Sequence, residues 1–198
     1  MKENIDKNAL LDEFLLSLSD NEWSESNYIE VIVKSSLSEA VWSSNFPLGL
    51  KDLTIFFIKR SVEHIELPLR DDFIALKTHE RLELVLMSFL NQFKHDKLVI
   101  RKLVNYLKTP ESIFTSPESV YFISDKFWKL IEDTSIDFNY YTKRFILMSV
   151  IVPTTIFWLS DESRDSIETN GYMKKCFKRS MKIGTFKNKI KKTLSKFF

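Results

Sequence analysis

Residues 136–159 read IDFNYYTKRFILMSVIVPTTIFWL, and this stretch decides the fold class. Its second part, from Phe145 to Leu159, is a largely apolar run. The run is shorter than the stretch of about 20 apolar residues that a membrane-crossing helix needs, and Pro153 interrupts it. We therefore predict a buried core helix over 136–159, kinked near Pro153, rather than a membrane span.

The composition of the whole chain also indicates a helical protein. The 198 residues are 44% hydrophobic, enough for a sizeable core, yet include only 3 glycines and 5 prolines. β-Sandwiches, barrels and nucleotide-binding α/β folds need more glycine than this at their turns and phosphate loops. The single cysteine excludes a disulfide scaffold and a multi-cysteine zinc site. The prediction is an all-α fold of nine to ten helices.

Apolar spacing, serine N-caps and the positions of proline set the expected helix boundaries. Pro68, Pro110 and Gly184 are expected to end helices, because none of them continues a helix easily. Helices are predicted over 6–19, 26–35, 38–45, 47–67, 70–92, 96–108, 116–131, 136–159, 160–183 and 185–198.

Charge is distributed very unevenly along the chain. The segment 174–198 carries ten Lys or Arg and no acid, whereas the segment 1–173 carries 19 basic and 27 acidic side chains. An acidic body with a basic end predicts that the end meets an anionic surface. The acids within the segment 1–13 fit neither a signal peptide nor a transit peptide. We expect a bacterial cytoplasmic protein, peripheral on the inner face of the cytoplasmic membrane, or on the matrix side if it is organellar.

The N-terminal segment 1–60 resembles the helix-turn-helix of TetR-type regulators, with a short helix over 38–45 followed by Phe46 and Pro47. Between Glu25 and Phe46, however, the only cation is Lys34. DNA-binding proteins neutralise phosphates with several Lys or Arg side chains, so we expect a scaffold without nucleic-acid binding. A ligand-responsive TetR-type transcriptional regulator is the alternative function.

No enzyme signature is present: the sequence has no glycine-rich phosphate loop, no Gly-x-Ser-x-Gly and no His-Glu-x-x-His. His79 and Glu83 lie one helical turn apart, but two side chains are too few ligands for a metal site. We therefore predict no catalytic residue, no metal and no cofactor.

The predicted helix over 116–131 has two patterned faces. Val120, Ile123, Phe127 and Leu130 form its core stripe at helical spacing. The opposite face carries aromatic and acidic residues. Two interpretations stay open: this face binds a partner, or it fills a second packing layer. Its residues are Tyr121, Asp125, Trp128 and Glu132.

Two motifs around the quoted stretch carry a family resemblance. Asp137-Phe138-Asn139-Tyr140-Tyr141-Thr142-Lys143-Arg144 precedes Thr154-Thr155-Ile156-Phe157-Trp158-Leu159-Ser160-Asp161-Glu162-Ser163. With Phe127-Trp128 and Phe46-Pro47, they resemble the ninth Coq protein family, accessory proteins of ubiquinone biosynthesis. Tyr140 stands where this family often has Trp, and Lys129 replaces part of an aromatic pair.

The resemblance implies a TetR-like homodimer that binds an isoprenoid quinone precursor or phospholipid and presents it to a membrane-associated quinone hydroxylase. It implies a helix-turn-helix-like subdomain over 1–46, a lipid-binding and dimerisation domain over 47–183 and an amphipathic membrane helix over 184–198. The hydroxylase contact maps onto the face of Tyr121, Asp125 and Trp128.

Large apolar side chains in the predicted helices over 70–92, 116–131 and 136–159 exceed the needs of a small bundle, so we predict an apolar pocket of about 300–1,000 Å³ among these helices. The lipid-lining candidates are Leu86, Phe89, Met148, Ile151 and Phe157.

The C-terminal stretch is predicted to be an amphipathic helix that lies in a membrane interface, with an apolar arc of roughly 140° flanked by lysines. The membrane-binding candidates are Phe186, Lys187, Ile190, Lys191, Leu194 and Phe197.

Overall fold

The computed structural model describes residues 6–113, 115–134 and 137–194, and the surroundings of the side chains at 70, 137, 138 and 181–194 lie outside the description. All regular elements in these ranges are helices, which confirms the all-α prediction and is consistent with a TetR-like order. Residues 1–64 and 93–119 form one compact unit, and residues 65–92 and 120–198 form a second. The predicted division of the chain into three functional domains, with boundaries after residues 46 and 183, stays a prediction.

The first unit contains the helix-turn-helix-like segment, and aromatic side chains fill its core. Trp23 contacts Phe14 and Phe57 edge-to-face, and its indole Nε1 donates to Thr54 Oγ1 at 2.9 Å. Trp42 is fully buried against Tyr28. The helices that begin in this unit are α1 (Lys7–Ser17), α2 (Glu25–Lys34), α3 (Glu39–Asn45), α4 (Leu50–Glu63), α7 (Lys97–Tyr106) and α8 (Thr115–Leu130), with a 3₁₀ turn η1 at Pro110–Ser112.

The start of α4 differs from the prediction of 47 because Gly49 adopts φ 61°, a left-handed conformation that favours glycine. Asp52 accepts the backbone N–H of Leu48 at 2.8 Å, so the loop is held before the helix begins. A Cβ at position 49 would lie 3.5 Å from the Tyr28 ring, so space alone does not require glycine there. The turn therefore delays the start of α4 from Pro47 to Leu50.

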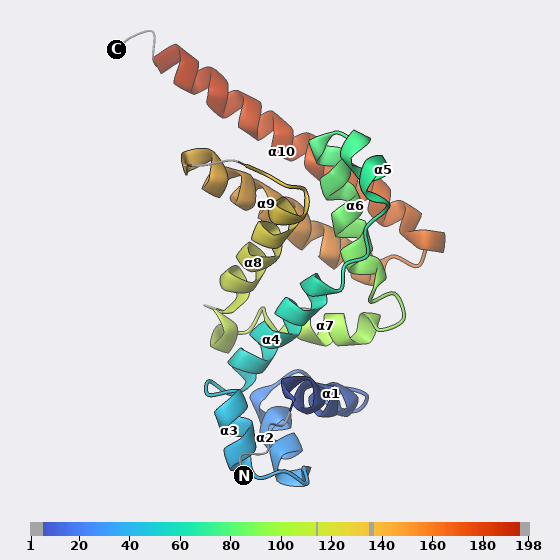
Figure 1. Ribbon diagram of the computed structural model, residues 1–198, viewed down its shortest axis with the longest axis vertical. Coiled ribbons are helices and arrows are strands. Elements are labelled where there is room, and N and C mark those ends of the chain that lie inside the picture. The colour runs from blue at the N-terminus through green and yellow to red at the C-terminus, as the bar shows by residue number, and fades with distance from the viewer. Residues whose placement is uncertain (1–5, 114, 135–136, 195–198) are drawn as a thin grey trace. The chain divides into compact units, whose positions relative to one another are not determined.

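The second unit is built around α9 and α10, which pack along each other, with α6 against both (Figure 1). Its elements are α5 (Arg70–Ala75), α6 (Thr78–Asn91), α9 (Asp137–Ser160), the 3₁₀ turn η2 (Arg164–Ser166) and α10 (Ile167–Leu194). The single helix predicted over 70–92 is wrong. Glu80 accepts the backbone N–H of Lys77 at 2.8 Å, and this cap begins a separate helix, α6.

The predicted break at Gly184 is also wrong. α10 continues through Gly184 to Leu194 as one helix (Figure 1). A glycine inside a helix costs only about 1 kcal/mol relative to alanine, which the good helix formers around it can offset. Pro153 likewise lies inside α9, which does not stop there.

α9 is longer than its apolar run suggested. The 22 residues of Asn139–Ser160 are long and apolar enough to cross a membrane by length and composition, but core helices of soluble proteins pass the same test. One face of α9 is buried, at Leu147, Val150 and Trp158. The opposite face is exposed, at Tyr141, Phe145, Val152 and Ile156. α9 is thus covered by its own unit on one side only.

Candidate functional site

A buried ion pair joins α8 to α9 where the Asp137–Arg144 motif begins α9. Arg144 is only 1% exposed, and its Nε donates to Asp125 Oδ1 at 2.7 Å. Tyr140 Oη donates to the same oxygen at 2.7 Å, and Lys129 Nζ lies 2.7 Å from Oδ2. Asp125 thereby receives three donors from two helices. We call Asp125, Lys129, Tyr140 and Arg144 the α8–α9 clamp.

The clamp is also held by ring and backbone contacts. The Arg144 guanidinium carbon lies 3.2 Å from the centroid of the Tyr140 ring, and its Nη1 donates to the Tyr140 carbonyl at 3.0 Å. The Arg144 carbonyl in turn accepts from Ser124 Oγ at 2.9 Å. Guanidinium stacking on an aromatic ring orients the charge while keeping its donors available. The motif residues that carry the resemblance therefore have a structural role.

The carboxyl of Asp125 is strongly stabilised as an anion. Burial alone would raise its pKa, but hydrogen bonds from Lys129, Tyr140 and Arg144 outweigh burial and lower the pKa from 3.8 to about 2. The hydrogen bond that Tyr140 donates to Asp125 also raises the pKa of the Tyr140 hydroxyl. Asp125 is therefore an anion at neutral pH, and its hydrogen bonds from Tyr140 and Arg144 hold α9 against α8.

The face of α8 opposite its core stripe does not point outward at two of its residues. Asp125 is 9% and Trp128 7% exposed, because α9 packs on this side of α8. Trp128 Nε1 donates to the Lys143 carbonyl at 3.2 Å, and Lys143 Nζ lies 4.9 Å from the Trp128 ring centroid. Tyr121 is partly exposed and contacts the exposed ring of Phe145. The second-packing-layer interpretation is thus correct for Trp128.

Asp161 holds the start of α10 in the second family motif. It is 6% exposed; its Oδ1 accepts from Ser163 N and its Oδ2 from Thr169 N, both at 2.8 Å. Burial opposes the anion, but the hydrogen bonds of Ser163 and Thr169 lower its pKa from 3.8 to about 2. This motif therefore positions α10 against α9.

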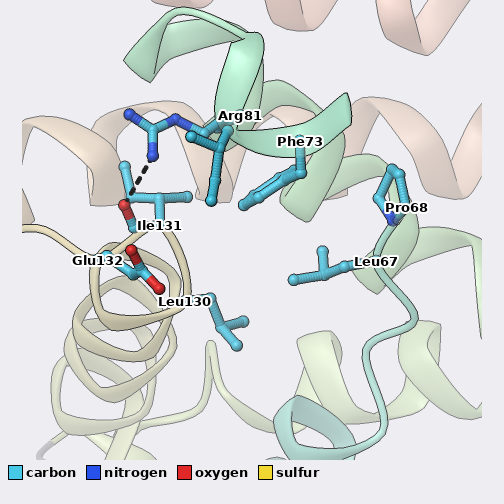
Figure 2. Close-up of a pocket in the computed structure, with 8 residues that line it drawn as sticks. Leu67, Pro68, Phe73, Arg81, Leu130, Ile131 and Glu132 are labelled. Atoms are coloured by element: carbon cyan, nitrogen blue, oxygen red, sulfur yellow. Dashed lines mark hydrogen bonds between the residues drawn. The ribbon is translucent and has the colours of Figure 1, made fainter. Parts of the chain in front are cut away.

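An apolar pocket of about 200 Å³ lies beside the C-terminal end of α8 (Figure 2). Arg81 at the start of α6 forms part of its wall, and its Nη1 donates to the Ile131 carbonyl at 3.0 Å. Two of the three helices predicted to form an apolar pocket, those over 70–92 and 116–131, contribute to its wall, but sequence reasoning named none of its lining residues as lipid-lining, because they come from segments that are distant in the sequence. Its lining residues are Leu67, Pro68, Phe73, Ile74, Arg81, Leu130, Ile131 and Glu132.

A second, more open groove of about 370 Å³ lies between α6 and the start of α10. Its lining is mixed, with the acids Glu80, Glu83 and Asp165 and the apolar Leu84 and Met173.

None of the five predicted lipid-lining residues lines either of these two pockets. Leu86, Phe89 and Ile151 are buried, Met148 is half-buried, and the half-buried Phe157 ring stacks on Tyr172 at 4.4 Å. The predicted membrane-binding residues Phe186, Lys187, Ile190, Lys191 and Leu194 lie where side chains are outside the description, and Phe197 lies outside the described residues altogether.

The short helix α3, which would read DNA in a TetR-type regulator, exposes Glu39, Ala40, Ser43 and Ser44. These side chains carry no positive charge with which to bind a phosphate.

Comparison with known proteins identifies the region that contains the clamp. Residues 113–184 match the family described as COQ9. This region is similar to COQ9, and we call the matched residues 113–184 the COQ9 domain. The resemblance to the ninth Coq family, read from the motifs at 127–163, is confirmed.

A curated relative supports the COQ9 assignment. The "Probable ubiquinone biosynthesis protein coq9, mitochondrial" of Dictyostelium discoideum is 28% identical to this chain over 138 residues. The match covers 63% of the chain and 45% of the relative, so it spans less than half of the relative's length. Within the COQ9 domain lie the whole clamp, the Asp161 cap and the pocket wall at Leu130 and Ile131.

Acid should weaken this COQ9 domain through Asp125 and Asp161. Both carboxyls have folded-state pKa values of about 2, below the ordinary value near 3.9, so the unfolded chain binds more protons between about pH 4 and pH 2. Their stabilisation is present above that window and is lost as pH falls through it. Each accounts for roughly 2 kcal/mol of unfolding free energy.

Urea titrations at a series of pH values measure this effect. Asp161→Asn should flatten the acid limb of the unfolding free energy, whereas Glu162→Gln, at the exposed neighbouring position, should leave the limb unchanged. An acid limb of equal slope in wild type and Asp161→Asn would contradict this expectation.

Proposed function

We propose that this chain is a non-catalytic accessory protein of ubiquinone biosynthesis that binds an isoprenoid quinone precursor and presents it to a membrane-associated quinone hydroxylase. The match of residues 113–184 to COQ9 is the observation that carries the proposal. The name of the Dictyostelium relative, a probable ubiquinone biosynthesis protein, supports the same pathway.

Lipid binding is supported by the pocket at the end of α8. Apolar side chains form most of its wall, and the two residues Leu130 and Ile131 among them belong to the matched region. A volume of about 200 Å³ holds part of an isoprenoid lipid, and the exposed Pro68 and Ile74 at its edge leave a route for the remainder. Leu86, Phe89, Met148, Ile151 and Phe157 stay candidates for a cavity that opens around a bound chain.

Membrane attachment is proposed for the C-terminal part of α10. The ten basic residues of 174–198, without any acid, supply about 1 kcal/mol each near an anionic surface. The mitochondrial name of the relative favours the matrix side of the inner membrane for an organellar member, and the cytoplasmic face of the membrane for a bacterial one.

A second copy of the chain is proposed to cover the exposed face of α9. Tyr141, Phe145, Val152 and Ile156 are 58%, 60%, 42% and 45% exposed and lie within an arc of roughly 60° on the helix. An uncharged stripe of this kind is costly to leave in water, and the same stripe on a two-fold related copy is self-complementary.

The hydroxylase contact is proposed near the accessible edge of the α8–α9 clamp. Asp125 and Trp128 are buried, so they would act by fixing α9, while the partly exposed Tyr121 on α8 offers an aromatic side chain to a partner. Exposed aromatic side chains of this kind are frequent anchors of protein interfaces.

Mass spectrometry of an organic extract of the purified full chain tests the lipid function. We expect an isoprenoid quinone precursor or a phospholipid, enriched over an extract of an unrelated protein purified from the same cells. An extract that contains neither lipid above that background would contradict the proposal.

Vesicle co-sedimentation tests the membrane function. Replacing Phe186, Ile190, Leu194 and Phe197 by Ser keeps every charge, so loss of binding to anionic vesicles would show that insertion of apolar side chains is required. We expect this variant and a chain ended at Gly184 both to lose binding, while the circular dichroism of the helical body is retained. Equal binding of the Ser variant would leave electrostatic attraction alone and rule out insertion.

A further inference from the structure

Arg81 has an unusual position in the wall of the pocket beside α8. The residue is partly buried, and its Nη1 donates to the Ile131 carbonyl, as Figure 2 shows by a dashed line. Its Nε is buried without a hydrogen-bond partner. Among the described residues, no carboxylate oxygen lies within 4.0 Å of this guanidinium. Arg81 therefore has no direct ion-pair partner in the described part of the chain.

A partly buried charge without a counter-charge destabilises the folded state unless something hydrogen-bonds to it. Arg144, by contrast, has both a carboxylate and an aromatic ring as partners. A guanidinium presents five N–H donors, and one hydrogen bond to a backbone carbonyl leaves most of them unused. Arg81 is thus equipped to bind an oxygen atom of a ligand that enters the pocket.

The size of the pocket limits what this ligand can be. A cavity of about 150 Å³ is known to bind benzene, so about 200 Å³ holds one six-membered ring with small substituents. The pocket is too small for a polyprenyl chain of many isoprene units. Leu67, Phe73, Leu130 and Ile131 supply apolar contact for the faces of such a ring.

The apolar wall of the pocket selects the kind of oxygen. Burying a phosphate or carboxylate head group against side chains such as Leu67, Phe73 and Leu130 carries a large desolvation cost. A neutral carbonyl or hydroxyl oxygen on a ring costs much less to bury and still accepts a strong hydrogen bond from a guanidinium. The lining therefore favours an uncharged, oxygen-substituted ring over an anionic lipid head group.

We propose that this pocket binds the oxygen-substituted ring of a quinone or quinol head-first, with Arg81 donating to a ring oxygen and the isoprenoid tail leaving past Pro68 and Ile74. The inference rests on the proposed function, which it deepens by naming the part of the lipid that is recognised and the residue that recognises it. Arg81 is then a specificity-determining residue that separates ring-bearing lipids from plain isoprenoids and phospholipids.

Ligand-observed NMR with two small probes tests the proposal on the full chain. Duroquinone is one fully substituted ring with two carbonyl oxygens, and tetramethylbenzene has a similar shape without oxygen. Arg81→Met should weaken duroquinone binding about 10- to 100-fold, the value of a charge-assisted hydrogen bond, and leave tetramethylbenzene binding unchanged. Arg164→Met, at a side chain that is 93% exposed, is the matched control and should change neither.

Two further variants keep the test decisive if Arg81→Met does not fold. Arg81→Lys keeps a donor and should retain part of the duroquinone affinity, whereas Ile74→Trp, on the exposed edge of α5, should fill the pocket and abolish binding of both probes. The inference is overturned if duroquinone does not bind wild type, if these variants bind it as wild type does, or if inorganic phosphate displaces it. Should the purified chain nevertheless carry an isoprenoid quinone lipid, the proposed function stands and only this pocket assignment fails.

Discussion

The contact between Arg144 and Asp125 is the constraint on which the second unit depends. A guanidinium that is 1% exposed must keep its carboxylate partner, because an unpaired charge at that depth would cost several kcal/mol. The pair need not stabilise the fold more than well-packed apolar residues would. What it supplies is a fixed register: α8 and α9 can meet only where Asp125 lies opposite Arg144 and Tyr140.

Contacts next to the clamp fix where α8 ends, and therefore where the pocket lies. Asp133 N donates to the Trp128 carbonyl at 3.0 Å, with Glu132 at φ 59° in the left-handed conformation that closes many helices. Lys143 Nζ holds Asp133 at 2.7 Å, and Trp128 packs beneath Lys143. The C-terminal end of α8, with Leu130 and Ile131, is thereby fixed as one wall of the pocket. The residues that carry the COQ9 resemblance thus fix the wall of the pocket without lining it themselves.

Local patterns in the sequence were sufficient for the fold class and for most helix boundaries. The helices predicted over 26–35 and 116–131 begin within one residue of the observed starts of α2 and α8. The two main errors have physical causes. The hydrogen bond from Lys77 N to Glu80 begins a new helix within the range 70–92, although the apolar spacing there is continuous. Gly184 does not end α10, because the helix continues through it.

The candidate site was less predictable than the fold. Apolar spacing correctly placed Ile123 and Phe127 in the core, but the second covered face of α8 depends on where α9 packs, which spacing cannot tell. The residues that line the pocket were not predicted for the same reason, since Arg81 and Ile131 are 50 residues apart in the sequence.

A double-mutant cycle between Asp125 and Arg144 tests most directly whether the clamp holds the second unit together. The unfolding free energy would be measured for wild type, Asp125→Asn, Arg144→Gln and the double variant. Because each single change removes one of the ion-pair partners of a buried charge, each should cost roughly 3 kcal/mol, and the double variant should cost clearly less than their sum. Single costs below about 1 kcal/mol that simply add in the double variant would contradict the account.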